Sequence, residues 1–232
     1  MPRPIDAPPD FQCLRDDLPI HRYTRNLPHW RQEGATYFVT FNLNDALPAQ
    51  AKHALRQQRR SLAMDAQRLD DETLLKRARR IARVEEQWLE RGFGACPFAQ
   101  PAARDILQDT IAFFDRSYAN PRTLPRYLLG AWVIMPNHMH VLIKPLDGET
   151  HPLERILQGW KSRSSRLMNK KAGKTGSIWF EESYDRIVRD SKHLWRCLQY
   201  IGNNGVVAGL CDDSFTRWVT PAWKEIGWGF ES

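Results

Sequence analysis

The chain has 232 residues, of which 42% are hydrophobic and 26% charged, a composition typical of soluble globular proteins that excludes disordered and fibrous chains. The formal net charge of +7 and a sequence pI near 9.4 favour a polyanionic partner, either nucleic acid or an anionic membrane surface, although evenly spread solubilising charge gives the same values. No apolar run reaches 18 residues and no apolar signal segment opens the chain, so we expect a cytoplasmic protein without a membrane partner.

The predicted elements follow one another in a simple order. Residues 1–35 are rich in proline and arginine without periodicity and predict an irregular N-terminal arm. Alternating aromatic and β-branched residues over 36–43 predict the first strand. Helical periodicity follows over 48–91, as two helices or one broken helix, and again over 102–118. The later segments predict two strands joined by a turn, a helix, a last strand and a closing helix, over 127–135, 138–145, 152–174, 177–189 and 191–204.

This order of elements predicts an α+β fold, a ferredoxin-like antiparallel sheet with helices packed on one face. We expect one domain over residues 36–210, preceded by the arm of residues 1–35. Residues 211–232, which include three tryptophans, are expected to form a tail that packs on the domain.

His138 and His140 stand two residues apart within an apolar segment. On a strand, residues i and i+2 project from the same face, so both imidazoles could hold one divalent cation. Zinc would normally require further protein ligands, and no HExxH motif, aspartate pair or cysteine set supplies them. A Mg²⁺ or Mn²⁺ ion completed by substrate phosphate and water suits so small a ligand set. The alternative is that the pair only decorates an exposed strand face.

Several segments share a family pattern. The run MPNHMHVLI (135–143) resembles the His-hydrophobic-His motif of HUH single-strand DNA nucleases. Four further segments resemble the REP-associated tyrosine transposases and occur in that family's order, namely YFVTFNL (37–43), LERILQGWKSRSSRLMN (153–169), IWFEESYDRIVRD (178–190) and YIGNNGVVAGL (200–210). The resemblance covers the chain from about Trp30 to Leu210.

The resemblance implies a nucleophile and a third metal ligand. In that family a tyrosine on the helix after the last strand attacks the phosphorus, and Tyr200 occupies this place. Asn204 lies one helical turn later and corresponds to the polar residue that joins the two histidines on the metal. The family usually continues Asn-Pro where this chain has Gly205, which leaves the orientation of Asn204 open. Tyr184 is the rival nucleophile.

Basic and aromatic residues supply the candidate DNA contacts. The helix over 152–174, its following loop and the last strand carry the best phosphate-binding candidates, which are Lys161, Arg163, Arg166, Lys170, Lys171, Lys174, Arg186 and Arg189. Trp160 is the candidate for stacking on an unpaired base, although buried aromatic residues are the commoner case. The family places contacts to a single-stranded tag in its N-terminal arm, which points to Arg22, Arg25 and Arg31.

The resemblance implies a metal-dependent single-stranded DNA endonuclease and strand transferase, a transposase that cuts and rejoins hairpin-forming REP-type repeats through a 5′-phosphotyrosine. Its cofactor would be Mg²⁺ or Mn²⁺, with no organic cofactor, and its partner DNA would place it at the nucleoid. A monomer is preferred over a dimer. One alternative is a catalytically silent protein that binds REP hairpins, and another is an RNA-binding ferredoxin-like module, which would be expected to carry paired aromatics on its central strands.

Overall fold

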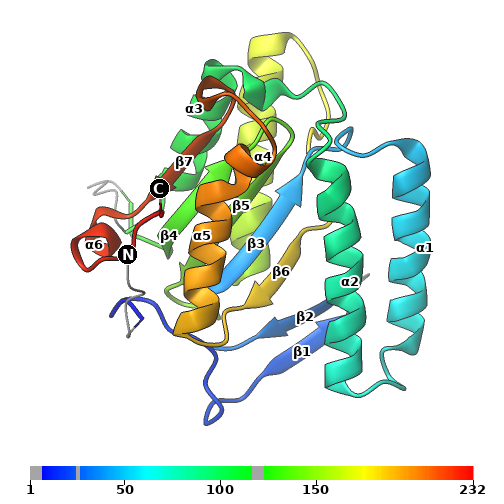
Figure 1. The fold of residues 1–232 in the computed structure, drawn as a ribbon, viewed down its shortest axis with the longest axis vertical. Coiled ribbons are helices and arrows are strands. Elements are labelled where there is room, and N and C mark those ends of the chain that lie inside the picture. The colour runs from blue at the N-terminus through cyan, green and yellow to red at the C-terminus, as the bar shows by residue number, and fades with distance from the viewer. Residues whose placement is uncertain (1–6, 25–26, 117–122, 232) are drawn as a thin grey trace.

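The computed structural model describes residues 7–24, 27–116 and 123–231. A five-stranded antiparallel sheet forms its centre, with the strand order β6-β3-β5-β4-β7 (Figure 1). The strands are β3 (Tyr37–Asn42), β4 (Tyr127–Ile134), β5 (His138–Pro145), β6 (Tyr184–Ile187) and β7 (Thr216–Val219). An α+β fold with an antiparallel sheet is therefore confirmed.

The helices have local sequence reasons for their bounds. The Asp70 and Asp190 side chains accept hydrogen bonds from backbone N–H groups three residues later, and these caps begin α2 and α5. Gly173 ends α4 with a positive φ of 64°. The α-helices are α1 (Ala49–Asp65), α2 (Asp71–Leu89), α3 (Pro101–Ala112), α4 (Leu153–Ala172), α5 (Ser191–Val207) and α6 (Pro221–Glu225), and two 3₁₀ turns cover Pro97–Ala99 and Asp212–Ser214.

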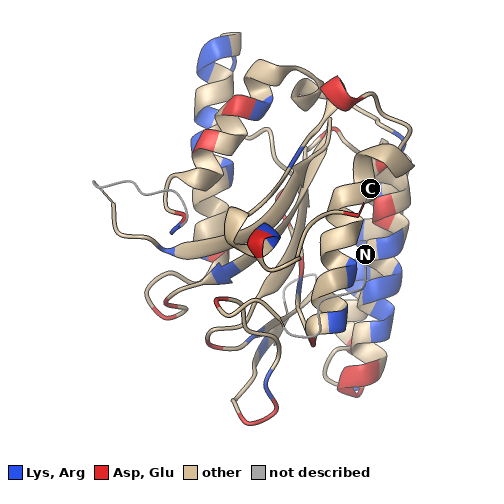
Figure 2. Ribbon diagram, turned by 60° about the vertical axis from the view of Figure 1, so that its left-hand side comes forward, with Lys and Arg blue, Asp and Glu red and all other residues tan. Residues whose placement is uncertain are grey.

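Helices cover both faces of the sheet, which corrects the expectation of one covered face. In β5, Val141 belongs to the same core as Trp160 of α4, whereas Leu142 belongs to the core that contains Leu198 of α5. Successive strand residues point to opposite faces, so α4 and α5 lie on opposite sides. Figure 1 shows α5 and α2 in front of the sheet, and Figure 2 shows helices on each side of it. Strands β4 and β5 are almost continuously apolar because both of their faces are buried.

The segment before β3 contains regular structure where an irregular arm was expected. Strands β1 (His21–Thr24) and β2 (Pro28–Arg31) form an antiparallel ribbon, and β2 packs beside β6. After α5, the side chains of Phe215, Val219, Trp223 and Trp228 pack in the core on the α5 face. Within the described ranges, no helix combines the length and apolar character needed to cross a membrane.

Candidate metal and nucleophile site

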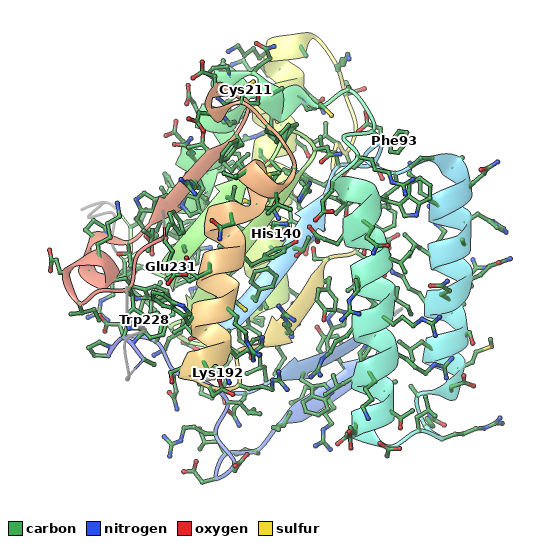
Figure 3. The ribbon with its side chains drawn as sticks, in the orientation of Figure 1. Phe93, His140, Lys192, Cys211, Trp228 and Glu231 are labelled. Atoms are coloured by element: carbon green, nitrogen blue, oxygen red, sulfur yellow. The ribbon has the colours of Figure 1, made fainter. Side chains whose placement is uncertain are left out.

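The two histidines open β5 and face α5. Their register partners on β3 are Asn42 for His138 and Thr40 for His140. Both imidazoles are buried, with side-chain exposures of 1% and 0%. Figure 3 shows His140 in the space between α5 and α2. The alternative that the pair decorates an exposed strand face therefore does not hold in this structure.

Hydrogen bonds orient both imidazoles through Nδ1. Asn137 donates its amide N–H groups to the Leu89 and Phe93 carbonyls, so its Oδ1 faces His138 Nδ1 at 2.7 Å. An amide oxygen can only accept, and His138 Nδ1 must therefore carry the proton and Nε2 the lone pair. His140 Nδ1 lies 2.8 Å from Thr40 Oγ1. The Nε2 atoms of both histidines remain without a hydrogen bond in the described part of the chain.

Glu86 of α2 completes a cluster that the sequence did not predict. Its Oε1 lies 3.1 Å from His140 Nε2 and 3.7 Å from His138 Nε2, and the possible ligand atoms of the three residues all lie within 4.8 Å of one another. A cation about 2.1 Å from its ligands holds neighbouring ligand atoms about 3.0 to 3.4 Å apart. The 3.1 Å separation lies in this range and the 3.7 Å separation is slightly wider, and the ligand atoms have no hydrogen-bond partner within the described residues, so a divalent cation could be held with small side-chain adjustments.

The electrostatics of the cluster keep its ligand atoms ready to bind a cation. Burial favours the neutral form of Glu86, but the interactions with His140 and His138 outweigh burial and lower the pKa of Glu86 to about 2. Burial, assisted by His140, lowers the pKa of His138 to about 3. At neutral pH the cluster therefore offers a carboxylate and an uncharged imidazole, the forms that bind metals.

Helix α5 brings Tyr200 and Asn204 to the same place. The Tyr200 and His140 ring centroids are 5.1 Å apart, and Asn204 is buried one turn later. The Tyr200 hydroxyl and Asn204 Oδ1 form no hydrogen bond with described residues. Burial, followed by the Glu86 charge, raises the pKa of Tyr200 well above its ordinary value. The structure thus gathers the two predicted histidines, Tyr200 and Asn204 within one chain.

A cleft of about 220 Å³ leads to Tyr200 between α2, β3 and β6. Its walls include Arg79, Arg83 and Glu86 of α2 and Tyr184 and Arg186 of β6. Tyr184, the rival nucleophile, therefore shares the cleft. No ring contact joins Tyr184 to either histidine in the described structure, whereas Tyr200 contacts His140 directly. This difference favours Tyr200.

The basic residues predicted to form one DNA surface lie on two sides of the sheet, because α4 packs on one face and Arg186 lines the Tyr200 cleft on the other. Arg186 lines the Tyr200 cleft and Arg189 an adjoining hollow. Lys161 donates hydrogen bonds to the Phe180 and Glu181 carbonyls, and Arg163 lies over the Phe113 ring. The remaining members, at or after the basic end of α4, are exposed, namely Arg166, Lys170, Lys171 and Lys174.

The structure places the predicted stacking residue and two of the predicted arm arginines in contacts within the protein. Trp160 requires correction: it is only 3% exposed and donates to the Tyr127 hydroxyl, so neither face is free for a base. Arg31 forms ion pairs with Asp185 and Glu154. Arg22 pairs with Asp71 and lies over Trp30. Arg25 lies outside the described residues.

The fold and site define an α+β protein in which a possible metal cluster of two imidazoles and a carboxylate faces a buried tyrosine. Neither protein-family models nor curated proteins give a match to the chain. Among solved structures, it is similar to a REP-associated tyrosine transposase bound to a REP hairpin, at 17% identity and a TM-score of 0.37, over 82% of this chain and 74% of that one. That neighbour is from the family that the sequence motifs resemble. Because this similarity is low, the function has to be inferred from the residues of the site.

Proposed function

We propose that this protein is a metal-dependent single-stranded DNA endonuclease and strand transferase of the REP-associated tyrosine transposase kind, with Tyr200 as its nucleophile. The observation that carries the proposal is the contact between Tyr200 and the His138, His140 and Glu86 cluster. Neither hairpin binding nor an RNA-binding sheet requires a buried tyrosine against two imidazoles whose Nε2 atoms have no hydrogen bond within the described residues.

Three side chains, His138, His140 and Glu86, would hold the divalent cation, and the free Oδ1 of Asn204 is available as a fourth ligand. Imidazole, carboxylate and amide donors suit Mn²⁺ and can serve Mg²⁺. When bound, the cation would polarise the scissile phosphate and offset the Glu86 charge that disfavours the Tyr200 phenolate.

The chain's own residues would carry out the transfer. The Tyr200 hydroxyl loses its proton and its oxygen attacks the phosphorus, while the bond from phosphorus to the 3′-oxygen breaks. The products are a 5′-phosphotyrosyl strand and a strand whose 3′-oxygen takes up a proton. Attack by another 3′-hydroxyl on the phosphotyrosine reverses the chemistry and joins strands without ATP. The ring contact between Tyr200 and His140 within one chain supports an active site assembled in a monomer.

Hairpin-forming repeats are the proposed substrate, with single-stranded DNA beside the hairpin foot as the cleaved part. The motif resemblance and the net charge of +7 support this class of partner. The transposase neighbour is bound to a REP hairpin, which is the same kind of DNA.

A covalent adduct assay tests the proposal. The wild type is incubated with Mn²⁺ and a single-stranded repeat hairpin labelled on its 3′ side, and the adduct is resolved on a denaturing gel. We expect an adduct with wild type and with Tyr184→Phe, none with Tyr200→Phe, and none after chelation. An adduct that persists in Tyr200→Phe and disappears in Tyr184→Phe would assign the nucleophile to Tyr184. No wild-type adduct, with hairpin binding retained, would support the catalytically silent alternative.

A further inference from the structure

The cleft that leads to Tyr200 is walled by arginines from two elements. Arg79, Arg83 and Glu86 follow one another at spacings of four and three residues, so they occupy one face of α2. Arg186 faces them from β6, where its guanidinium lies 4.9 Å from the centroid of the Phe38 ring. This face of α2 therefore places the positive charges of Arg79 and Arg83 on the way to Tyr200 and the negative charge of Glu86 beside the histidines.

The arginines of the cleft lack the counter-ions that two arginines elsewhere on α1 and α2 have. Arg77 of α2 pairs with Asp65, and Arg59 of α1 pairs with Glu85. In the described part of the chain, no carboxylate lies within 4.0 Å of Arg79, Arg83 or Arg186.

The cations also affect one another. Burial first, and then the positive charges of Arg189 and Arg186, lower the pKa of Arg79 below its ordinary value. An uncompensated group of like charges around a cleft is a binding site for anions.

A second hollow continues the cleft away from Tyr200. It shares Arg79, Tyr184 and Arg186 with the first and extends to Trp30 and Arg189. Arg189 lines the second hollow and Arg79 and Arg186 line both, so cations continue from the second hollow into the Tyr200 cleft. A single strand carries one phosphate on each nucleotide, and a row of arginines beside aromatic rings suits such a strand without reading its sequence.

We propose that this path, between α2 and β6, is a groove for the backbone of single-stranded DNA, in which Arg79 and Arg83 bind the phosphates next to the one that Tyr200 attacks. The inference rests on the proposed function for the identity of the ligand. It assigns α2 a double role, since the same helix face carries Glu86 to the metal cluster and the arginines to the strand.

Binding measured without cleavage tests the groove. In a Tyr200→Phe background, fluorescence anisotropy follows a labelled repeat hairpin with a single-stranded tail. Arg79→Ala with Arg83→Ala should weaken binding about tenfold and reduce the salt dependence of log K by about 0.7 for each phosphate that the variant no longer neutralises. The matched control, Arg60→Ala with Arg80→Ala, removes the same charge from helix positions that line neither hollow. It should change affinity less than about threefold. Thermal melts establish that each variant is folded.

A modified strand locates the binding position. Replacing the phosphates that flank the cleavage site with neutral methylphosphonates should weaken binding to the Tyr200→Phe protein and have little further effect on the Arg79 and Arg83 double variant. Equal weakening with both arginine pairs would show that only overall charge matters and would overturn the groove. Unchanged affinity in the cleft variant would also overturn it. A wild-type protein that forms no adduct but shows the predicted binding pattern would reject the proposed chemistry and leave the groove in place.

Discussion

Two buried polar clusters lie on opposite sides of the sheet. They differ in whether their charged and polar atoms have hydrogen-bond partners. Towards α4, Asp185 accepts from His29 at 2.7 Å and from Arg31 at 2.5 Å, and Arg31 also donates to Glu154 at 2.6 Å. Each of these interactions joins the N-terminal ribbon to β6 or to α4. Towards α5, the His138, His140 and Glu86 cluster leaves ligand atoms of all three residues without hydrogen bonds.

The difference separates a structural role from a binding role. A buried polar atom without a partner costs stability, whereas a paired one is roughly neutral or favourable. The Asp185 network needs no further ligand because its charges satisfy one another. The histidine cluster is satisfied only when something is added to it. Burial of a histidine beside a carboxylate therefore does not by itself identify a site, since both clusters have that feature.

The largest expected effect comes from breaking the paired cluster. Asp185→Asn should lower the free energy of unfolding by about 3 to 5 kcal/mol, because Arg31 and His29 lose a buried charged partner. His140→Ala, measured without metal, should cost less, since it removes the contacts with Thr40 Oγ1 and Glu86 Oε1 but does not break a charged network as fully paired as that of Asp185. Urea unfolding measures both, with exposed Asp105→Asn as the control. Equal destabilisation from both clusters would mean that they do not differ in role.

Metal should stabilise the protein through one cluster alone. At a concentration of about 100 times its dissociation constant, Mn²⁺ should raise the free energy of unfolding of the wild type by about 2.7 kcal/mol. A His138→Ala, His140→Ala double variant should show almost none of this gain. Glu86→Gln and Asn204→Ala, compared side by side, then determine which one supplies a further ligand. Differential scanning calorimetry with and without Mn²⁺ gives the result, and an undiminished gain in the double variant would place the metal elsewhere.

The sequence predicted those parts of the site that depend on local spacing. Period-two geometry placed His138 and His140 on one face, and helical spacing placed Asn204 one turn after Tyr200. Glu86 and the cleft arginines were missed because α2 meets β5 and α5 only through tertiary packing. A weak signal existed, since Glu85 interrupts the apolar stripe of α2 and marks a helix face that faces polar groups. The burial of both sheet faces was likewise readable from the continuously apolar runs of β4 and β5.

The smallest expected effect is the pH dependence of the free energy of unfolding, which differs between the α5 side and the α4 side of the sheet. Burial and then the charges of Arg186, Arg189 and Arg196 lower the pKa of His193 to about 3. Below its ordinary pKa of about 6.5 the unfolded chain binds a proton that the folded His193 does not, so stability falls as the pH falls from about 6.5 towards 3. Because His193 is buried and stays unprotonated in the folded protein over this range, proton uptake by the unfolded chain sets the loss at about 2 kcal/mol between pH 7 and 5.

Burial raises the pKa of the Asp185 carboxylate, but the charge of Arg31 and the contact with His29 outweigh burial and lower this pKa to about 2. Its stabilisation is complete above about pH 4 and disappears only as the pH falls from there to about 2. Urea unfolding at pH 7 and 5 therefore isolates the α5 side. His193→Gln, which keeps an acceptor for the Arg189 backbone N–H, should show a smaller loss than the wild type between these two values. Asp185→Asn should leave the difference between pH 7 and 5 unchanged, although it lowers stability at both. An equal pH dependence in wild type and His193→Gln would mean that burial and the neighbouring arginines do not keep this histidine neutral.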